Sequence, residues 1–205
     1  MSKIEVDTIE PQSGTSLTLG ASGDTITIPS GATLDGSNAT LTGIGTATTN
    51  GITETDQWRV TANFTNAGNG VDEDTTSNWE RADTSDFEKI GTGLTESSGI
   101  FSFPSTGKYL IDFKTSYYPS GANSGIYVKI NVTTDNSSYT TRAQGLSGSA
   151  GADRPEHIGT SCIIDVTDTS NVKFKIITNG ATNVTWQGNS NSQEFGFTSI
   201  RLGDT

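Results

Sequence analysis

The sequence is poor in the residues that build helices. Hydrophobic residues make up 31% and charged residues 17% of its 205 residues, where typical shares are about 45–50% and about 25%. Glycine, threonine, serine and asparagine fill the difference. Because Ala, Leu, Glu and Lys carry helix propensity and form coiled-coil seams, their scarcity excludes a helix bundle. We therefore predict an all-β protein.

Basic residues are also scarce. The chain has 12 Lys and Arg against 23 Asp and Glu, which gives a net charge of −11. Nucleic-acid affinity depends on clustered basic residues, so we expect no nucleic-acid partner. No apolar run approaches the roughly 18 residues of a membrane span, and the first ten residues lack the basic and apolar blocks of a signal peptide. We expect a soluble product without membrane insertion.

Cysteine and histidine each occur once, which limits the available chemistry. Cys162 alone excludes an intrachain disulfide and an all-cysteine metal site. Its position on an apolar alternating segment favours a buried, inert thiol. Any histidine-based mechanism would have to use His157, which we place in a surface loop. The acidic run Asp72–Asp74 lacks the alternating spacing of a calcium loop. We expect no catalytic residue, no metal and no cofactor.

Aromatic residues are absent before Trp58, so the first segment differs in kind from the rest. Short alternating apolar units lie between glycine- and serine-rich turns there. Their aliphatic residues are Leu17, Leu19, Ile26, Ile28, Leu34, Leu41 and Ile44. So few side chains cannot offset the conformational entropy lost on ordering one copy. The segment is either disordered or pairs with identical copies, and its β-branched pattern favours the second. We predict an N-terminal attachment segment and intertwined β shaft over residues 1–56.

Residues 57–205 contain all the aromatic residues and form the second predicted domain. Apolar residues alternate with polar ones in several segments, as expected of half-buried strands. The inward-facing sets are Trp58, Val60, Ala62 and Phe64; Phe101 and Phe103; Tyr109, Ile111 and Phe113; Ile126, Val128, Ile130 and Val132; Ile158, Thr160, Cys162, Ile164 and Val166; and Val172, Phe174 and Ile176.

Two of these segments flank a turn, and the last segment breaks the alternation. Pro104 and Gly107 are suited to a tight turn, which predicts a hairpin between Phe103 and Tyr109. At the C-terminal end, Phe195 and Phe197 lie on one parity while Ile200 and Leu202 lie on the other. This pattern indicates either a β-bulge or a strand with two buried faces, the second of which would imply a subunit interface.

The string PheSerPheProSerThrGlyLysTyrLeuIleAspPhe resembles the central hairpin of jelly-roll heads in the tumour-necrosis-factor and complement-collagen superfamily. The Trp58 strand and the aromatic final strand agree with that layout, so the resemblance implies a jelly-roll β-sandwich knob over residues 57–205. A collagen-like Gly-X-Y stalk is absent, so the mammalian secreted members match the first 50 residues poorly.

The N-terminal string IleGluValAspThrIle, followed by SerGlyThrSerLeuThrLeuGly, is similar to the start of fibre-type structural proteins of tailed, particularly marine, bacteriophages. That resemblance implies a homotrimer located in the virion, with Ile4, Val6 and Ile9 in the segment that attaches to other virion proteins. It implies a non-enzymatic appendage whose knob binds the host surface. A capsid decoration or head fibre without a receptor role and a polysaccharide-cleaving appendage enzyme are the alternatives.

Binding of a host surface glycan would use aromatic side chains exposed on the knob. Trp79, Tyr117 and Tyr118 are the candidates. Trp186 lies on a short alternating segment and is equally compatible with the core, so its position is left open.

The entropy argument for the shaft can be tested on an isolated peptide. A monomeric peptide of residues 1–56 should lack ordered β structure, because a single copy has neither strand partners nor sufficient apolar burial. Circular dichroism measures this directly. A well-formed β spectrum from a monomeric peptide would contradict the argument.

Overall fold

A computed structural model describes residues 9–11, 13–33, 52–83 and 87–205 of the chain. The chain divides into two compact units, Met1–Ala47 and Thr48–Thr205. In the described part of the first unit no strand is present, and the aliphatic side chains are exposed. These side chains are Ile9, Leu17, Leu19, Ile26 and Ile28. Ile4, Val6, Leu34, Leu41 and Ile44 lie outside the described residues, and the intertwined shaft stays a prediction.

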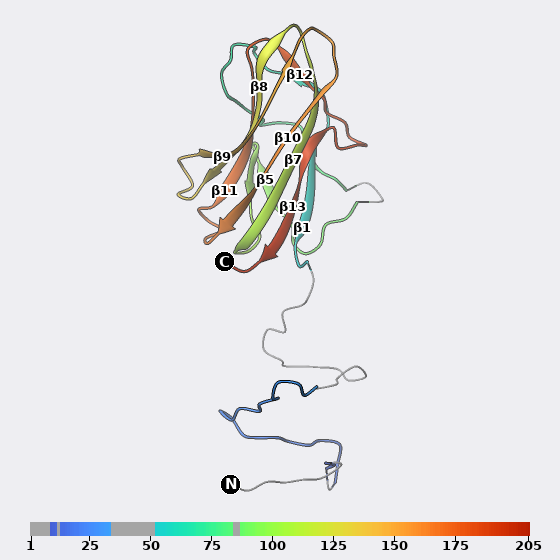
Figure 1. Cartoon of the computed structure of the whole chain (residues 1–205), viewed down its shortest axis with the longest axis vertical. Coiled ribbons are helices and arrows are strands. Elements are labelled where there is room, and N and C mark those ends of the chain that lie inside the picture. The colour runs from blue at the N-terminus through green and yellow to red at the C-terminus, as the bar shows by residue number, and fades with distance from the viewer. Residues whose placement is uncertain (1–8, 12, 34–51, 84–86) are drawn as a thin grey trace. The chain divides into compact units, whose positions relative to one another are not determined.

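The second unit, which we call the knob, is a sandwich of two antiparallel sheets, and the described residues contain no helix (Figure 1). The larger sheet contains β1 (Thr55–Val60), β2 (Phe64–Thr65), β4 (Trp79–Arg81), β7 (Gly107–Pro119), β10 (Glu156–Val166), β12 (Val184–Trp186) and β13 (Phe195–Gly203). The smaller sheet contains β3 (Glu73–Asp74), β5 (Thr95–Ser97), β6 (Ile100–Ser102), β8 (Asn123–Thr133), β9 (Thr140–Ser149) and β11 (Lys173–Gly180).

Strand β7 organises the larger sheet. It pairs with β10 along one side and with β13 and then β12 along the other (Figure 1). In the smaller sheet, β8 lies between β9 and β11. The predicted inward faces of β7, β8 and β11 are confirmed, since their alternate apolar side chains are buried. On β10, Ile158, Ile164 and Val166 are buried while Thr160 and Cys162 are half-buried.

The predicted hairpin at Pro104 is wrong, although its parity is right. Strand β6 pairs with β5 and β11, whereas β7 lies in the other sheet, so the turn carries the chain across the sandwich. Phe103 and Tyr109 still pack together, with ring centroids 4.7 Å apart. A shared inward parity is equally satisfied by two strands that face each other from opposite sheets.

The predicted continuous strand from Trp58 to Phe64 is also wrong. Strand β1 ends at Val60, and Ala62 is exposed between β1 and β2. Residues after Trp186 take the hydrogen bonds at this break, because the Asn189 amide donates to the Val60 carbonyl and the Gly188 amide donates to the Asn63 side chain. A side chain on Gly188 would collide with the Ala62 carbonyl, 2.2 Å from the ideal Cβ position. Residues 188–189 therefore take the place of a strand partner beside Val60 and Asn63, and β1 ends at Val60.

The break in alternation at the C-terminal strand has two structural causes. Phe195 and Phe197 face the core, and Ile200 faces the opposite side of the sheet. Beyond it, the pairing of β13 with β7 shifts between Arg201 and Gly203, as in a β-bulge, and Leu202 is exposed there. Both a bulge and a second apolar face are thus present.

A cluster of aromatic rings joins the two sheets. Phe101 of β6 lies at its centre, with ring centroids 5.4 Å from Trp58, 5.0 Å from Trp79 and 4.7 Å from Phe197 across the sandwich. Within its own sheet it stacks on Phe174 at 5.1 Å. Edge-to-face pairs of this kind add about 0.5–1.5 kcal/mol each beyond their area burial.

Substitutions at two neighbouring positions of β7 test the register. Phe113 is fully buried against Phe195, so Phe113→Ala should lower the free energy of unfolding by about 3–5 kcal/mol. Lys114 points outward to a solvent-exposed ion pair with Asp112, so Lys114→Ala should cost less than about 0.5 kcal/mol. Denaturant melts measure both. Equal effects of the two substitutions would contradict the assigned strand phase.

Candidate functional site

The outer face of the larger sheet carries an apolar row. Cross-strand pairing aligns Ile163 of β10 with Leu110 of β7, Leu110 with Ile200 of β13, and Ile200 with Thr55 of β1. Ile90 continues the row through an isolated bridge to Thr55. Ile163 is 61% exposed and Ile90 48% exposed. We call Ile163, Leu110, Ile200 and Ile90 the apolar row; it crosses the outer face of the larger sheet and is interrupted only by Thr55.

A cleft adjoins the row at the edge of the sandwich. It has a volume of about 330 Å³ and shares Ile163 with the apolar row. Val132, Val172 and Cys162 line its apolar part, and Arg142 and Asp165 supply charged groups. Cys162 is half-buried here, whereas the sequence predicts a buried thiol, and this partial burial raises the pKa of the thiol. We call this hollow the edge cleft.

A second hollow, of about 470 Å³, lies further along the outer face of the larger sheet and is lined mostly by residues with polar side chains. Its side chains include Ser116 and His157, joined by a 2.9 Å hydrogen bond between the serine Oγ and the histidine Nδ1, and also Gln193 and Glu194. Among the described residues no carboxylate bonds to the His157 ring, so a Ser-His-acid triad is not assembled.

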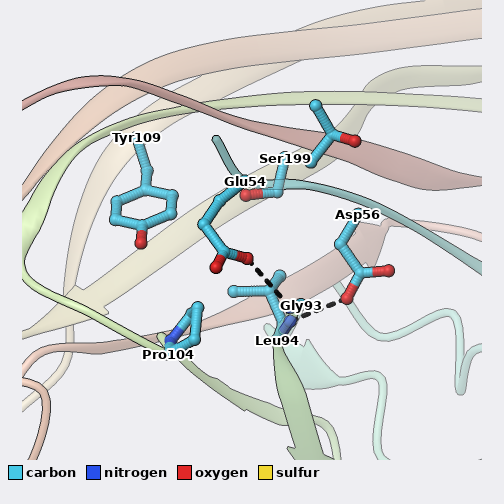
Figure 2. Close-up of a pocket in the computed structure, with 8 residues that line it drawn as sticks. Glu54, Asp56, Gly93, Leu94, Pro104, Tyr109 and Ser199 are labelled. Carbon is cyan, nitrogen blue, oxygen red and sulfur yellow. Dashed lines mark hydrogen bonds between the residues drawn. The ribbon is translucent and has the colours of Figure 1, made fainter. Parts of the chain in front are cut away.

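The start of the knob is held by carboxylates that accept backbone hydrogen bonds, as Figure 2 shows. Glu54 accepts from the Thr92 and Gly93 amides at 3.0 and 2.9 Å. Asp56 accepts from the Leu94 amide at 2.7 Å and from the Trp58 indole at 2.9 Å. The space enclosed beside Glu54, Pro104 and Tyr109 is too narrow for a water molecule. These contacts are therefore structural, and we call those that Glu54 makes with the Thr92 and Gly93 amides the Glu54 clamp.

Buried Asp56 also forms an ion pair, with Arg81 of β4. The Arg81 Nε lies 2.9 Å from Asp56 Oδ1, and the guanidinium lies 4.8 Å from the centroid of the Trp58 ring. The carboxylate thus receives charge-assisted and backbone donors together, which compensates its desolvation. The pair fastens β4 and the 91–94 loop to β1.

The glycan candidates chosen from the sequence lie in different environments. Tyr117 is fully buried beside Trp186, with ring centroids 5.3 Å apart, and burial raises the pKa of its phenol. Trp79 is half-buried among Phe101, Phe195 and Phe197, and its indole donates to the Thr75 carbonyl.

The expectation that Tyr117 is exposed is therefore wrong, because its parity on β7 points into the sandwich. Trp186 is a core residue. Tyr118, 37% exposed, remains an exposed candidate on the outer face.

The residues of the apolar row were missed as a group, although a signal for them exists. Leu110 follows Tyr109 and Ile163 precedes Ile164, so each places an apolar residue on the parity that should face solvent. Such doublets predict strands with two apolar faces, and Ile200 had supplied the same signal in the final strand.

Metal and membrane features are not found in the part of the chain that the structure describes. No group of three or more metal-ligating side chains gathers there. No helix in those residues is long and apolar enough to cross a membrane.

Comparison with known proteins relates the knob to solved structures by fold. No protein-family model matches the sequence, and neither does any curated protein. Eiger TNF from S. frugiperda is similar with a TM-score of 0.55 at 16% identity, over 74% of this chain and 93% of that one. The knob is a TNF-like jelly roll. Murine APRIL at pH 5.0 is similar with a TM-score of 0.53 at 8% identity, over 73% of this chain and 98% of its own. Its structure at pH 8.0 gives 0.52 with the same identity and coverage.

Two glycines with the same backbone conformation test the Glu54 clamp. Gly91 has φ +76°, and an added Cβ would lie 2.4 Å from the Glu54 carboxyl carbon. Gly70 has φ +72°, with nothing within 4 Å of an added Cβ. Both alanine variants pay for a left-handed conformation, but only Gly91→Ala displaces the carboxylate. We expect Gly91→Ala to lower the free energy of unfolding by about 1–3 kcal/mol more than Gly70→Ala in denaturant melts. Equal losses would show that the clamp contributes nothing.

Proposed function

We propose that this chain is a non-enzymatic structural protein of a bacteriophage virion, a homotrimeric fibre that attaches by its N-terminal segment and presents the knob to the host surface. The observation that supports association of copies is the apolar row, whose end residues Ile163 and Ile90 are exposed on the outer face of the larger sheet. A single chain gains nothing by exposing Ile163 and Ile90 to water, whereas association would bury them.

The shape of the apolar surface supports a closed ring of copies. The apolar row lies on a sheet face and the edge cleft lies at a sheet edge, so they are two different surfaces that meet at Ile163. A contact between two different patches is heterologous, and such contacts close into rings when the rotation between copies permits. A homotrimer with a threefold axis is the ring we propose, as the TNF-like fold and the fibre resemblance both suggest.

The N-terminal segment supports the same assembly. Its described aliphatic side chains are exposed and its described residues form no strand within one chain. Burial of these side chains between copies is what an intertwined shaft would supply. Ile4, Val6 and Ile9 remain the residues we assign to attachment on the particle.

Two variants with matched exposure test the trimer. Light scattering of the full chain at micromolar concentration should give about three times 21.5 kDa. Ile163→Asp places a charge in the apolar row and should reduce the mass toward that of the monomer. Leu146→Asp, at a leucine of the other sheet that is also 61% exposed, should leave the mass unchanged. A monomeric full chain, or a trimer that survives Ile163→Asp, would overturn the proposed interface.

Location on the particle tests the rest of the proposal. Antibodies against the knob should label appendages of purified virions in electron micrographs, and label confined to the capsid shell would favour the decoration alternative. Shortening of host polysaccharide by the purified chain would favour the enzyme alternative. Virions without label would contradict a structural role.

A further inference from the structure

The outer face of the smaller sheet carries a tyrosine that lies over a glycine. Tyr127 and Gly125 are two residues apart on β8, so they share one face of the sheet. An ideal Cβ on Gly125 would lie 3.0 Å from Cε2 and 3.2 Å from the hydroxyl oxygen of Tyr127. The ring thus occupies the space that a side chain at position 125 would fill, and it lies along the strand. Aromatic rings cover glycines on sheet surfaces in this way.

Neighbouring strands surround this ring with both apolar and polar groups. Leu146 of β9 is directly opposite Tyr127 and is 61% exposed. Gln144, also exposed, is opposite Lys129, and Asn179 of β11 flanks Tyr127 on the other side. We call Tyr127 with Lys129, Gln144, Leu146 and Asp72 the Tyr127 platform.

The charges of the Tyr127 platform are paired with each other. The Lys129 ammonium lies 2.7 Å from both carboxylate oxygens of Asp72 and 5.7 Å from the centroid of the Tyr127 ring. The Asn179 amide donates to Asp72 at 2.8 Å. Burial alone would raise the pKa of Asp72, but the hydrogen bonds from Lys129 and Asn179 outweigh it and the pKa is lowered. Asp72 is therefore an ionised acceptor beside a cationic donor.

Resting on the host-surface role proposed above, we infer that the Tyr127 platform binds a neutral sugar residue of a surface glycan. A pyranose has an apolar face of C–H groups that packs on an aromatic ring, and its hydroxyls both donate and accept hydrogen bonds. Tyr127 is half-buried, and the part of its ring that faces outward supplies the surface for stacking. Asp72 supplies acceptors, Lys129 donors, and Gln144 both.

Charge favours a neutral glycan over an acidic one. Lys129 and Asp72 neutralise each other, so Lys129 is not available as an unpaired cation for a sugar carboxylate. The whole chain has a net charge of −11, which repels an acidic polymer at long range. A neutral, hydroxyl-rich sugar needs no unpaired cation and is not repelled by the net negative charge. Three platforms on one trimer would convert a weak single contact into strong attachment.

A glycan microarray tests the Tyr127 platform with the full chain. The array carries neutral hexose oligomers and uronate-containing oligomers, and binding is measured for the unmodified protein and three variants. Binding to at least one neutral oligomer is expected. Tyr127→Ala should weaken it about tenfold or more, because stacking is lost. Tyr127→Phe should retain most of it, because the ring remains. Tyr139→Ala removes another half-buried tyrosine that lies beside a lysine but outside the platform, and it should change nothing.

The outcomes separate this inference from the proposed function. Binding to uronate oligomers alone, no binding to any oligomer, or equal binding by Tyr127→Ala would overturn the Tyr127 platform. Circular dichroism melts establish that each variant is folded. Light scattering and virion labelling test the proposed function independently, so a trimeric virion protein with a blank array refutes only the platform. A monomeric chain that binds neutral oligomers through Tyr127 refutes only the fibre.

Discussion

The packing of aromatic rings around Phe101 is the interaction on which the rest of the knob depends. One ring from the smaller sheet contacts Trp58, Trp79 and Phe197 of the larger sheet, so it fixes the distance and the alignment of the two layers. Only 31% of the residues are hydrophobic, so the apolar contacts that can join the two sheets are few. Further ring pairs extend this packing along the core to Phe195 and Trp186. The functional surfaces we propose both lie on the outer faces of the sandwich.

Strand parity was the part of the structure that the sequence made predictable. Alternation along β7, β8 and β11 identified buried side chains, because a residue period of two follows directly from strand geometry. The pairing of strands was not predictable in the same way. Phe103 and Tyr109 have the parity of a hairpin, yet β6 and β7 belong to different sheets. Parity shows which side chains face inward. It does not show to which of the two sheets their strand belongs.

The candidate surfaces were harder to predict than the core. The sequence indicates Tyr117 and Trp79 as aromatic residues suited to sugar, but Tyr117 is fully buried and Trp79 lies half-buried against the core. Tyr127 was overlooked because it alternates with buried Ile126 and Val128 and therefore looks like an ordinary outward residue. Only the structure places its ring over Gly125 and beside Lys129. Surface function here depends on neighbours from β9 and β11, which are distant in sequence.

The Glu54 clamp has a mechanical consequence. Tension applied to the chain ahead of the knob reaches it at Glu54, immediately before β1, which pairs with β13 on one side and β4 on the other. A pull along the direction of β1 loads the hydrogen bonds of both ladders together, in shear, whereas a pull across an edge strand would break them one after another. The amides of Thr92 and Gly93 hold Glu54 ahead of those ladders, so this short loop carries the load first. An appendage tethered through its N-terminal segment would thus transmit force into the interior of its largest sheet and spare the edges.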